Sequence, residues 1–236
     1  MQLSESVALV TGASKGLGLE VARAYAERGA KLVIAARRQD ELEAAASELR
    51  TRTDVVALAL DVSEEAERLV AAGRAQFGGI DVLVNNASTI GPSPMPRLDQ
   101  YDWRELAQVF RVNVLAPLHL AQLVLPDMRK RGDGVIINVT SDAGVEAYPG
   151  WGGYGASKAA LEHVSRTLAA ELETTGVRVY AVDPGDMNTE MHQWAEPDED
   201  LSGLPGPQAP VPEFVRLVEV ETAPFARVWA QAVRAA

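Results

Sequence analysis

Short runs of β-branched and other apolar residues alternate along the chain with longer amphipathic segments. The runs cover residues 7–11, 31–36, 55–60, 81–85, 134–140 and 177–183. The segments with helical spacing cover residues 16–28, 39–50, 63–77, 103–130 and 155–174. Because the runs are nearly all apolar, we interpret them as strands covered on both faces, as in a parallel sheet. The pattern predicts a single α/β domain over residues 1–236, a Rossmann-type doubly wound parallel sheet with helices on both faces.

The alternation stops after residue 183. Residues 184–212 are rich in glycine and proline and contain the acidic run EPDED at 196–200. A connection this long in a compact domain is typically functional or disordered, and we expect a lid loop on the substrate side. A short helix is expected at about 212–221. Residues 225–231 fit either a last strand or a further helical turn, because periodicity alone does not separate the two.

The composition excludes several classes of function. A net charge of −11 argues against binding to nucleic acid or to an anionic membrane surface. The chain has no cysteine, which excludes disulfides and thiol catalysis and is compatible with a cytoplasmic location. No spacing of histidines indicates a metal site. The N-terminus lacks the features of a signal peptide, and no uninterrupted apolar run reaches the ~18 residues of a spanning helix.

A glycine-rich stretch, TGASKGLG, joins the first predicted strand to the first predicted helix. Glycines at this position allow a tight turn and a close approach of the backbone, and the following helix presents free N–H groups to an anion. A plain strand-to-helix turn is the alternative. The context favours a nucleotide, and the residues expected to contact it here are Gly12, Ser14, Lys15, Gly16, Leu17 and Gly18.

The end of the second predicted strand indicates which nucleotide is bound. A carboxylate is usual there, about 20 residues after the glycines, because it accepts the ribose 2′-hydroxyl of NAD. This chain has Arg37 and Arg38 instead. Guanidinium groups pair with a 2′-phosphate, and Lys15 in the glycine-rich loop is placed to reach the same group. The residues therefore predict NADP(H), with two solvated arginines as the alternative.

Tyr154 and Lys158 lie four residues apart where an alanine-rich helix is expected to begin. Residues at this spacing share one face of a helix, so the phenol and the amine point the same way. A surface pair is the simple alternative, and a pattern this short requires support from other parts of the chain.

That support comes from further motifs in a fixed order. They are NNAS at 85–88, Asn113 within a long helix, INVTSDAG at 137–144, YGASK at 154–158 and DPGDMNTEM at 183–191. Together with the glycine-rich loop they resemble the short-chain dehydrogenase/reductase family over residues 4–190. Each motif is common alone, and their order and placement make the resemblance specific.

The resemblance implies roles for four residues. Tyr154 is expected to be the general acid in reduction and the general base in oxidation. Lys158 is expected to lower the pKa of Tyr154 from ~10 to about 7, a shift of ~4 kcal/mol, and to hold the ribose. Ser141 would hydrogen-bond the substrate oxygen, although alone it resembles a turn-capping serine. Asn113 would kink its helix and hold a water near Lys158; an exposed or helix-bonded asparagine is the alternative.

The resemblance also implies further contacts to the cofactor. These residues are Asp61, Val62, Asn85, Ala87, Pro184, Gly185 and Thr189. Asp61 could equally cap the helix that follows it, and the two roles are compatible. The chain departs from the family in its C-terminal segment, 213–236, where the usual ending of the last strand is missing. Ser88 replaces the usual glycine of the NNAG motif and is expected to narrow the space near the ribose.

These observations predict an NADP(H)-dependent oxidoreductase that interconverts a ketone or aldehyde and its alcohol. A 3-oxoacyl thioester reductase and a catalytically silent NADP(H) sensor or scaffold are the alternatives. Aromatic and methionine residues are candidates for an apolar substrate pocket, and they are Tyr148, Trp151, Met187, Met191 and Trp194. The resemblance further implies a homodimer or homotetramer that associates through the helices at 103–130 and 155–174.

Overall fold

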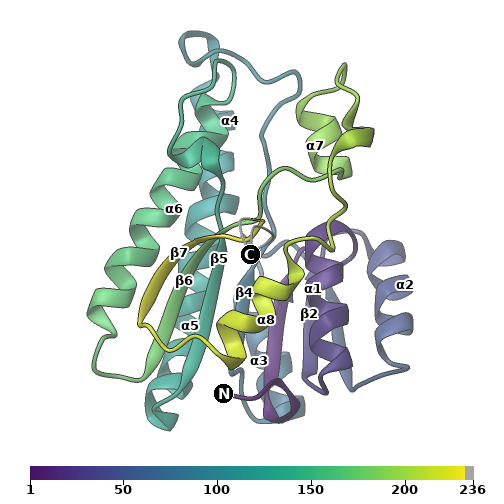
Figure 1. Cartoon of the computed structure of the whole chain (residues 1–236), viewed down its shortest axis with the longest axis vertical. Coiled ribbons are helices and arrows are strands. Elements are labelled where there is room, and N and C mark those ends of the chain that lie inside the picture. Colours follow the sequence, from purple (N-terminus) through teal and green to yellow (C-terminus); the bar gives the residue numbers. More distant parts are fainter. Residues whose placement is uncertain (232–236) are drawn as a thin grey trace.

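Seven parallel strands form one sheet in the order β3-β2-β1-β4-β5-β6-β7 (Figure 1). The computed structural model describes residues 1–231 of the chain. The strands are β1 (Val7–Thr11), β2 (Lys31–Ala36), β3 (Val55–Ala59), β4 (Val82–Asn85), β5 (Gly134–Val139), β6 (Val177–Asp183) and β7 (Phe225–Trp229). Side chains of β1, β4, β5 and β6 are buried throughout, as expected for strands covered on both faces.

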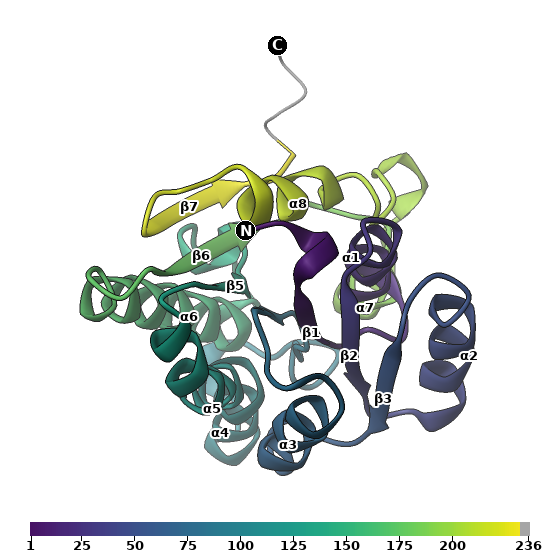
Figure 2. The same ribbon diagram turned by 90° about the horizontal axis from the view of Figure 1, so that it is seen from below.

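Helices cover both faces of the sheet. They are α1 (Gly16–Glu27), α2 (Gln39–Leu49), α3 (Ala66–Phe77), α4 (Trp103–Phe110), α5 (Ala116–Arg131), α6 (Gly152–Glu171), α7 (Glu190–Ala195) and α8 (Val211–Glu219). Figure 2 shows α3, α4, α5 and α6 on one face and α1, α2 and α8 on the other. Each face has its own apolar core, one containing Tyr25 and Phe214 and the other Leu120 and Leu168. The predicted Rossmann-type α/β fold is confirmed.

The predicted helix at 103–130 has an internal irregularity. Residues Arg111–Leu115 form a π-helical segment between α4 and α5, in which the Ala116 N–H donates to the Arg111 carbonyl five residues earlier. Pro117 contributes to the π-helical geometry, because proline has no N–H to donate to the carbonyl of Asn113 four residues earlier. The whole helix, Trp103–Arg131, is long and apolar enough to cross a membrane by composition alone, but half of its most apolar window is buried in the protein.

The segment 184–212 contains more regular structure than the sequence predicted. It includes the helix α7 and a 3₁₀ turn at Leu201–Gly203. The Thr189 hydroxyl accepts a hydrogen bond from the His192 N–H and so caps α7. Ala195 and Leu201 are buried, which anchors the segment on the body of the protein.

The C-terminal segment forms the last strand despite its unusual sequence. Strand β7 pairs in parallel with β6, with Phe225 opposite Val179 and Trp229 opposite Asp183. The Tyr180 hydroxyl donates to the Ala223 carbonyl and supports the connection into β7. Of the two structures expected for residues 225–231, a strand or a further helical turn, the strand forms, and it covers residues 225–229. Residues 232–236 of the predicted segment lie outside the described residues.

Truncating Phe214 on α8 is expected to destabilise the fold strongly. This side chain is fully buried, and the backbone carbonyl of Phe214 accepts a hydrogen bond from the Tyr25 hydroxyl. Phe214→Ala should lower the free energy of unfolding by about 3–5 kcal/mol, measured by denaturant titration. Val220→Ala is the control, because Val220 is 67% exposed. This substitution should change the free energy of unfolding by about 0.5 kcal/mol or less. Equal effects of the two variants would contradict the described packing of α8.

Candidate active site

The glycine-rich loop lies where strand order reverses, between β1 and α1. Gly12 and Gly16 have positive φ angles of 65° and 57°, which favour glycine over other residues. A Cβ at Gly18 would lie 2.3 Å from the Gly12 carbonyl oxygen, so the turn can close only without a side chain there. A Cβ at Gly16 would meet nothing within 4 Å, so open space lies in front of the first turn of α1. The geometry is that of an anion cradle at a helix N-terminus.

Asn86 holds the glycine-rich loop against the end of β4. Its side-chain amide donates to the carbonyls of Thr11 and Gly12, at 2.9 and 3.1 Å. The Thr11 hydroxyl accepts from the backbone N–H groups of Asn86 and Ala87, both at 3.0 Å. Sequence reasoning did not single out Asn86, although it lies within the NNAS motif.

The side chain of Asn85, which was expected to lie along the ribose, hydrogen-bonds within the protein. It is buried and donates both amide hydrogens within the protein, to Asn138 at 2.8 Å and to the Pro117 carbonyl at 3.3 Å. The expected capping role of Asp61 is confirmed, since it accepts from the backbone N–H and the hydroxyl of Ser63, and its contact with the cofactor stays a prediction. The Asp61 carboxylate therefore caps the turn after β3.

Two of the three predicted phosphate-binding cations are paired with carboxylates. Lys15 Nζ lies 2.5 Å from Glu190 on α7 and 3.5 Å from Glu41 on α2. Arg38 lies 2.8 Å from the same Glu41 carboxylate. Arg37 is exposed beside them. Lys15 and Arg38 thus lie close together, as the sequence predicted. Both contact acidic residues that the sequence did not single out.

Tyr154 and Lys158 share one face of α6. Lys158 Nζ lies 5.3 Å from the centre of the Tyr154 ring and donates to the Val139 carbonyl at 2.8 Å. Gly155 brings this helix close to the turn that follows β5, because a Cβ there would lie 2.4 Å from the Ala143 carbonyl oxygen. The close packing places Ser141, at the start of that turn, next to Tyr154.

Ser141 caps the turn and also acts on Tyr154. Its hydroxyl accepts from the Ala143 N–H and donates to Asp142. Burial raises the pKa of Tyr154, and the nearby hydroxyls of Ser141 and Ser88 partly offset this rise. The interpretation of Ser141 as a turn cap is confirmed, and its hydrogen bond to the substrate oxygen stays a prediction.

Burial dominates the electrostatics of the Tyr154–Lys158 pair. It raises the pKa of Tyr154, and the negative charge of Asp183 raises it further. It lowers the pKa of Lys158 to about 7. Lys158 was expected to lower the pKa of Tyr154, but in the chain without a cofactor this pKa is raised. The spacing of the two residues predicts the attraction between their charges but does not reveal the cost of removing both from water.

Asn113 fastens the loop after β4 to α6. Its carboxamide oxygen accepts from the Thr89 N–H at 2.9 Å and the Ser88 hydroxyl at 3.1 Å. Its amide donates to the Thr89 carbonyl at 2.8 Å and the Ser157 hydroxyl at 2.9 Å. The alternative of an exposed or helix-bonded asparagine is wrong, because the side chain is buried in this network. Ser88, expected only to narrow the ribose space, is a member of it.

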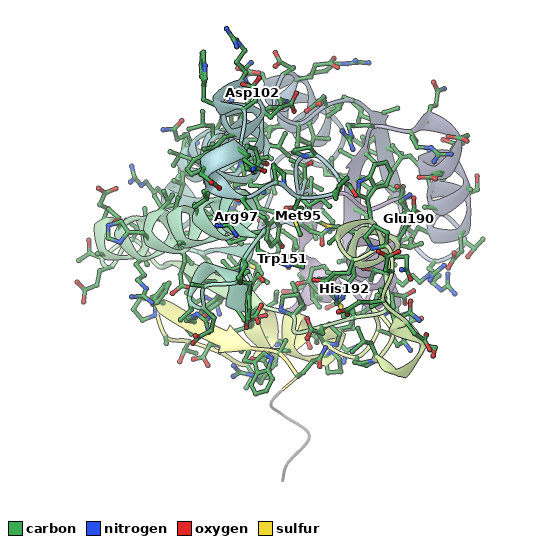
Figure 3. The ribbon with its side chains drawn as sticks, turned by 90° about the horizontal axis from the view of Figure 1, so that it is seen from above. Met95, Arg97, Asp102, Trp151, Glu190 and His192 are labelled. Carbon is green, nitrogen blue, oxygen red and sulfur yellow. The ribbon has the colours of Figure 1, made fainter. Side chains whose placement is uncertain are left out.

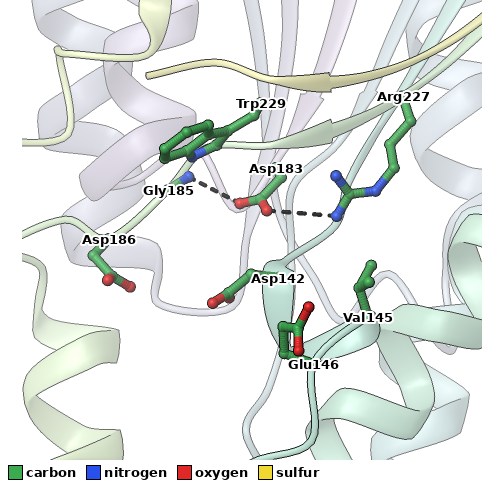
Figure 4. A pocket seen from close by; sticks show the side chains of 8 residues that line it. All are labelled: Asp142, Val145, Glu146, Asp183, Gly185, Asp186, Arg227 and Trp229. Carbon is green, nitrogen blue, oxygen red and sulfur yellow. Dashed lines mark hydrogen bonds and ion pairs between the residues drawn. The ribbon is translucent and has the colours of Figure 1, made fainter. Parts of the chain in front are cut away.

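A cavity of about 290 Å³ opens beside the turn that follows β5 (Figure 4). Its lining is rich in carboxylates, and the residues are Asp142, Val145, Glu146, Asp183, Gly185, Asp186, Arg227 and Trp229. Arg227 of β7 lies 3.6 Å from Asp183 and 2.8 Å from Glu162 on α6. Sequence reasoning missed Arg227 and Trp229, since it treated the C-terminal segment as atypical.

The five predicted substrate-pocket residues do not line this cavity. The Tyr148 hydroxyl donates to Asp142, and the Trp151 ring packs edge-on against Tyr154, with 5.8 Å between ring centres. In Figure 3, which looks down onto this edge of the sheet, Trp151 marks the start of α6 and Glu190 marks α7. Met191 and Trp194 of α7 are exposed, and Met187 packs on the core. An apolar pocket formed by these residues stays a prediction.

The arrangement of loop, serine, tyrosine and lysine agrees with a known family. Residues 6–200 match the sequence profile described as short chain dehydrogenase. The chain belongs to the short-chain dehydrogenase family. It is an oxidoreductase of that family by this match and by its curated relatives.

An uncharacterized oxidoreductase of Staphylococcus epidermidis is 34% identical over 190 residues, which cover 80% of this chain and 81% of the relative. Two solved structures are similar over almost the whole fold. A short chain dehydrogenase of Escherichia coli CFT073 in complex with NADPH is 29% identical, with a TM-score of 0.85 and 96% of each chain covered. L-sorbose reductase of Gluconobacter frateurii, in complex with NADPH and L-sorbose, is 30% identical, with a TM-score of 0.84, and 98% of this chain and 97% of the reductase are covered.

Replacing Lys158 with methionine tests the electrostatics of the buried amine. The unfolded chain keeps this proton up to its ordinary pKa of 10.5, whereas the folded chain releases it at about 7. The unfolded state therefore binds more protons between these values, and Lys158 makes stability rise with pH across that window. Relative to Lys158→Met, the wild type should gain up to about 1.4 kcal/mol per pH unit from pH 7 to pH 10.

The measurement is denaturant unfolding of both proteins across this pH range. Replacing the exposed Lys130 with methionine is the matched control for removing an amine. A stability difference between wild type and Lys158→Met that stays constant with pH would refute the lowered pKa.

Proposed function

We propose that this chain is an NADP(H)-dependent oxidoreductase that interconverts a ketone or aldehyde and the corresponding alcohol. The observation that carries the proposal is the meeting of Ser141, Tyr154 and Lys158 at the same sheet edge as the glycine-rich loop. In open parallel sheets ligands bind at the carboxyl ends of the strands, where the strand order reverses.

The residues around the glycine-rich loop fit NADP(H). The open space before α1 suits a pyrophosphate, and Lys15 and Arg38 provide the positive charge that a 2′-phosphate requires. The NADPH complexes of the two similar structures support the same cofactor. When bound, the nicotinamide group supplies or accepts the hydride and, in its oxidised form, adds a positive charge beside Tyr154.

Tyr154 donates its hydroxyl proton to the carbonyl oxygen during reduction, and Ser141 hydrogen-bonds the same oxygen. An alkoxide is a stronger base than a phenolate, so a raised pKa at Tyr154 still permits this transfer. In oxidation the phenol must first be ionised, and the same raised pKa opposes that step.

Lys158 returns the proton to Tyr154. Because burial places its pKa at about 7, the amine both binds and releases a proton near neutrality. The hydrogen bond to the Val139 carbonyl holds Nζ beneath the Tyr154 ring.

Replacing Tyr154 with phenylalanine tests the acid–base role. Turnover should fall by at least about 100-fold, because the proton donor is lost, while the dissociation constant of NADPH stays nearly unchanged. Turnover is followed as the oxidation of NADPH with a carbonyl substrate, and binding by NADPH fluorescence. Retained turnover in this variant would remove Tyr154 from the mechanism.

Cofactor choice is tested at Arg38. Replacing Arg38 with glutamine removes one charge-assisted contact to the 2′-phosphate and should weaken NADPH binding about tenfold while leaving NADH unchanged. The measured quantity is the ratio of kcat/KM for NADPH to that for NADH in both proteins. A wild type that prefers NADH would overturn the assignment.

Two substrate classes have support. Trp151 beside Tyr154 favours an apolar or aromatic carbonyl compound. The carboxylates of the cavity, which accept hydrogen bonds from hydroxyl groups, favour a polyhydroxylated one, and the similar L-sorbose reductase supports this second class. A panel of aromatic ketones, ketoses and 3-oxoacyl thioesters separates these classes and includes the alternative thioester reductase. Tight NADPH binding without turnover on the whole panel would instead favour the sensor.

We further propose that the chain forms a homodimer or homotetramer through α4, α5 and α6. Large apolar side chains exposed near these helices support an interface, among them Trp103 and Leu115, which are 68% and 57% exposed.

We also propose a cytoplasmic location, which is supported by the absence of cysteine from the sequence.

A further inference from the structure

Lys15 links the cofactor loop to α7. It stands immediately before α1, and its amine contacts Glu190 at 2.5 Å and Glu41 at 3.5 Å. Glu190 is the first residue of α7, and Lys15 lowers the pKa of its carboxyl group through a hydrogen bond and its charge. One amine therefore holds two carboxylates, from α2 and from α7, at the place where the proposed 2′-phosphate would bind.

Few other polar contacts attach α7 and its flanks to the body of the protein. The Ser93 hydroxyl donates to the Trp194 carbonyl, and the Trp151 indole donates to Glu196 just after the helix. Trp151 immediately precedes α6 and packs against Tyr154. The segment thus extends from the cofactor loop to the catalytic helix, and the Lys15–Glu190 pair is its attachment at the cofactor end.

We propose that Glu190 is a specificity-determining residue that competes with the 2′-phosphate of NADP(H) for Lys15. A phosphate dianion carries more charge than a carboxylate and attracts the amine more strongly, so its binding displaces Glu190 and releases this end of α7. NADH has no 2′-phosphate and leaves the Lys15–Glu190 pair in place. The inference rests on the proposed function, because it requires the cofactor to bind at this loop.

The competition makes the position of α7 depend on the cofactor. By thermodynamic linkage, the factor by which Glu190 weakens NADPH binding equals the factor by which NADPH weakens the attachment of α7. Lys15 and Glu190 are partly solvated, with 46% and 62% of their side chains exposed. An exposed ion pair of this kind changes an equilibrium by about fivefold or less.

Replacing Glu190 with glutamine tests the competition through binding alone. Glu190→Gln should tighten NADPH binding by about two- to fivefold and leave the dissociation constant of NADH unchanged, both measured by nicotinamide fluorescence. Asp198→Asn is the matched control, since Asp198 is an exposed carboxylate of the same segment outside the Lys15 ion pairs. It should change neither constant. Equal shifts for the two cofactors, no shift, or the same shift in Asp198→Asn would each overturn the proposal.

Hydrogen exchange of the backbone amides in residues 190–195 provides a second readout. In the wild type these amides should exchange faster with saturating NADPH than with saturating NADH. In Glu190→Gln the two cofactors should give the same rates. Identical wild-type rates in the two complexes would overturn the inference and leave the oxidoreductase proposal standing, whereas failure to bind either cofactor would overturn both.

Discussion

The hydrogen bond from Lys158 Nζ to the Val139 carbonyl joins α6 to β5, the strand that leads to Ser141. It can form because Gly155 lets α6 approach the turn after β5 closely. The approach buries the lysine, and the burial then sets the pKa values of both Lys158 and Tyr154. The position of the serine and the pKa values of the Tyr154–Lys158 pair thus follow from the close packing of α6 on this turn.

Acidic residues of this chain lie at both ends of the site, at the cofactor loop and at the cavity. At the cofactor loop, Glu41 and Glu190 hold the amine and guanidinium groups that a phosphate would need. At the cavity, Asp142 and Asp183 oppose ionisation of Tyr154. Carboxylates in both places oppose additional negative charge, that of a phosphate at the cofactor loop and that of an ionised Tyr154 at the cavity.

Much of the fold could be predicted from the sequence, because strands buried on both faces leave a strong apolar pattern, and so do the helices that cover them. The glycine-rich loop, Tyr154 and Lys158 could be located because their chemistry requires fixed local spacing. The network of Asn113 and the position of Arg227 could not. Each depends on contacts between residues distant in the chain, and such contacts leave no periodic signal. The burial that sets the pKa of Lys158 is likewise a property of packing.

Arg227 lies on the last strand, yet its guanidinium group contacts Glu162 of the catalytic helix and Asp183 beside the cavity. Every motif by which the family is recognised precedes it in the chain. A protein shortened by proteolysis before residue 225 would retain all those motifs and lose the counter-charge of Asp183. Such a fragment would still contain every motif of the family, although the negative charge of Asp183, which acts on the pKa of Tyr154, would have lost its partner.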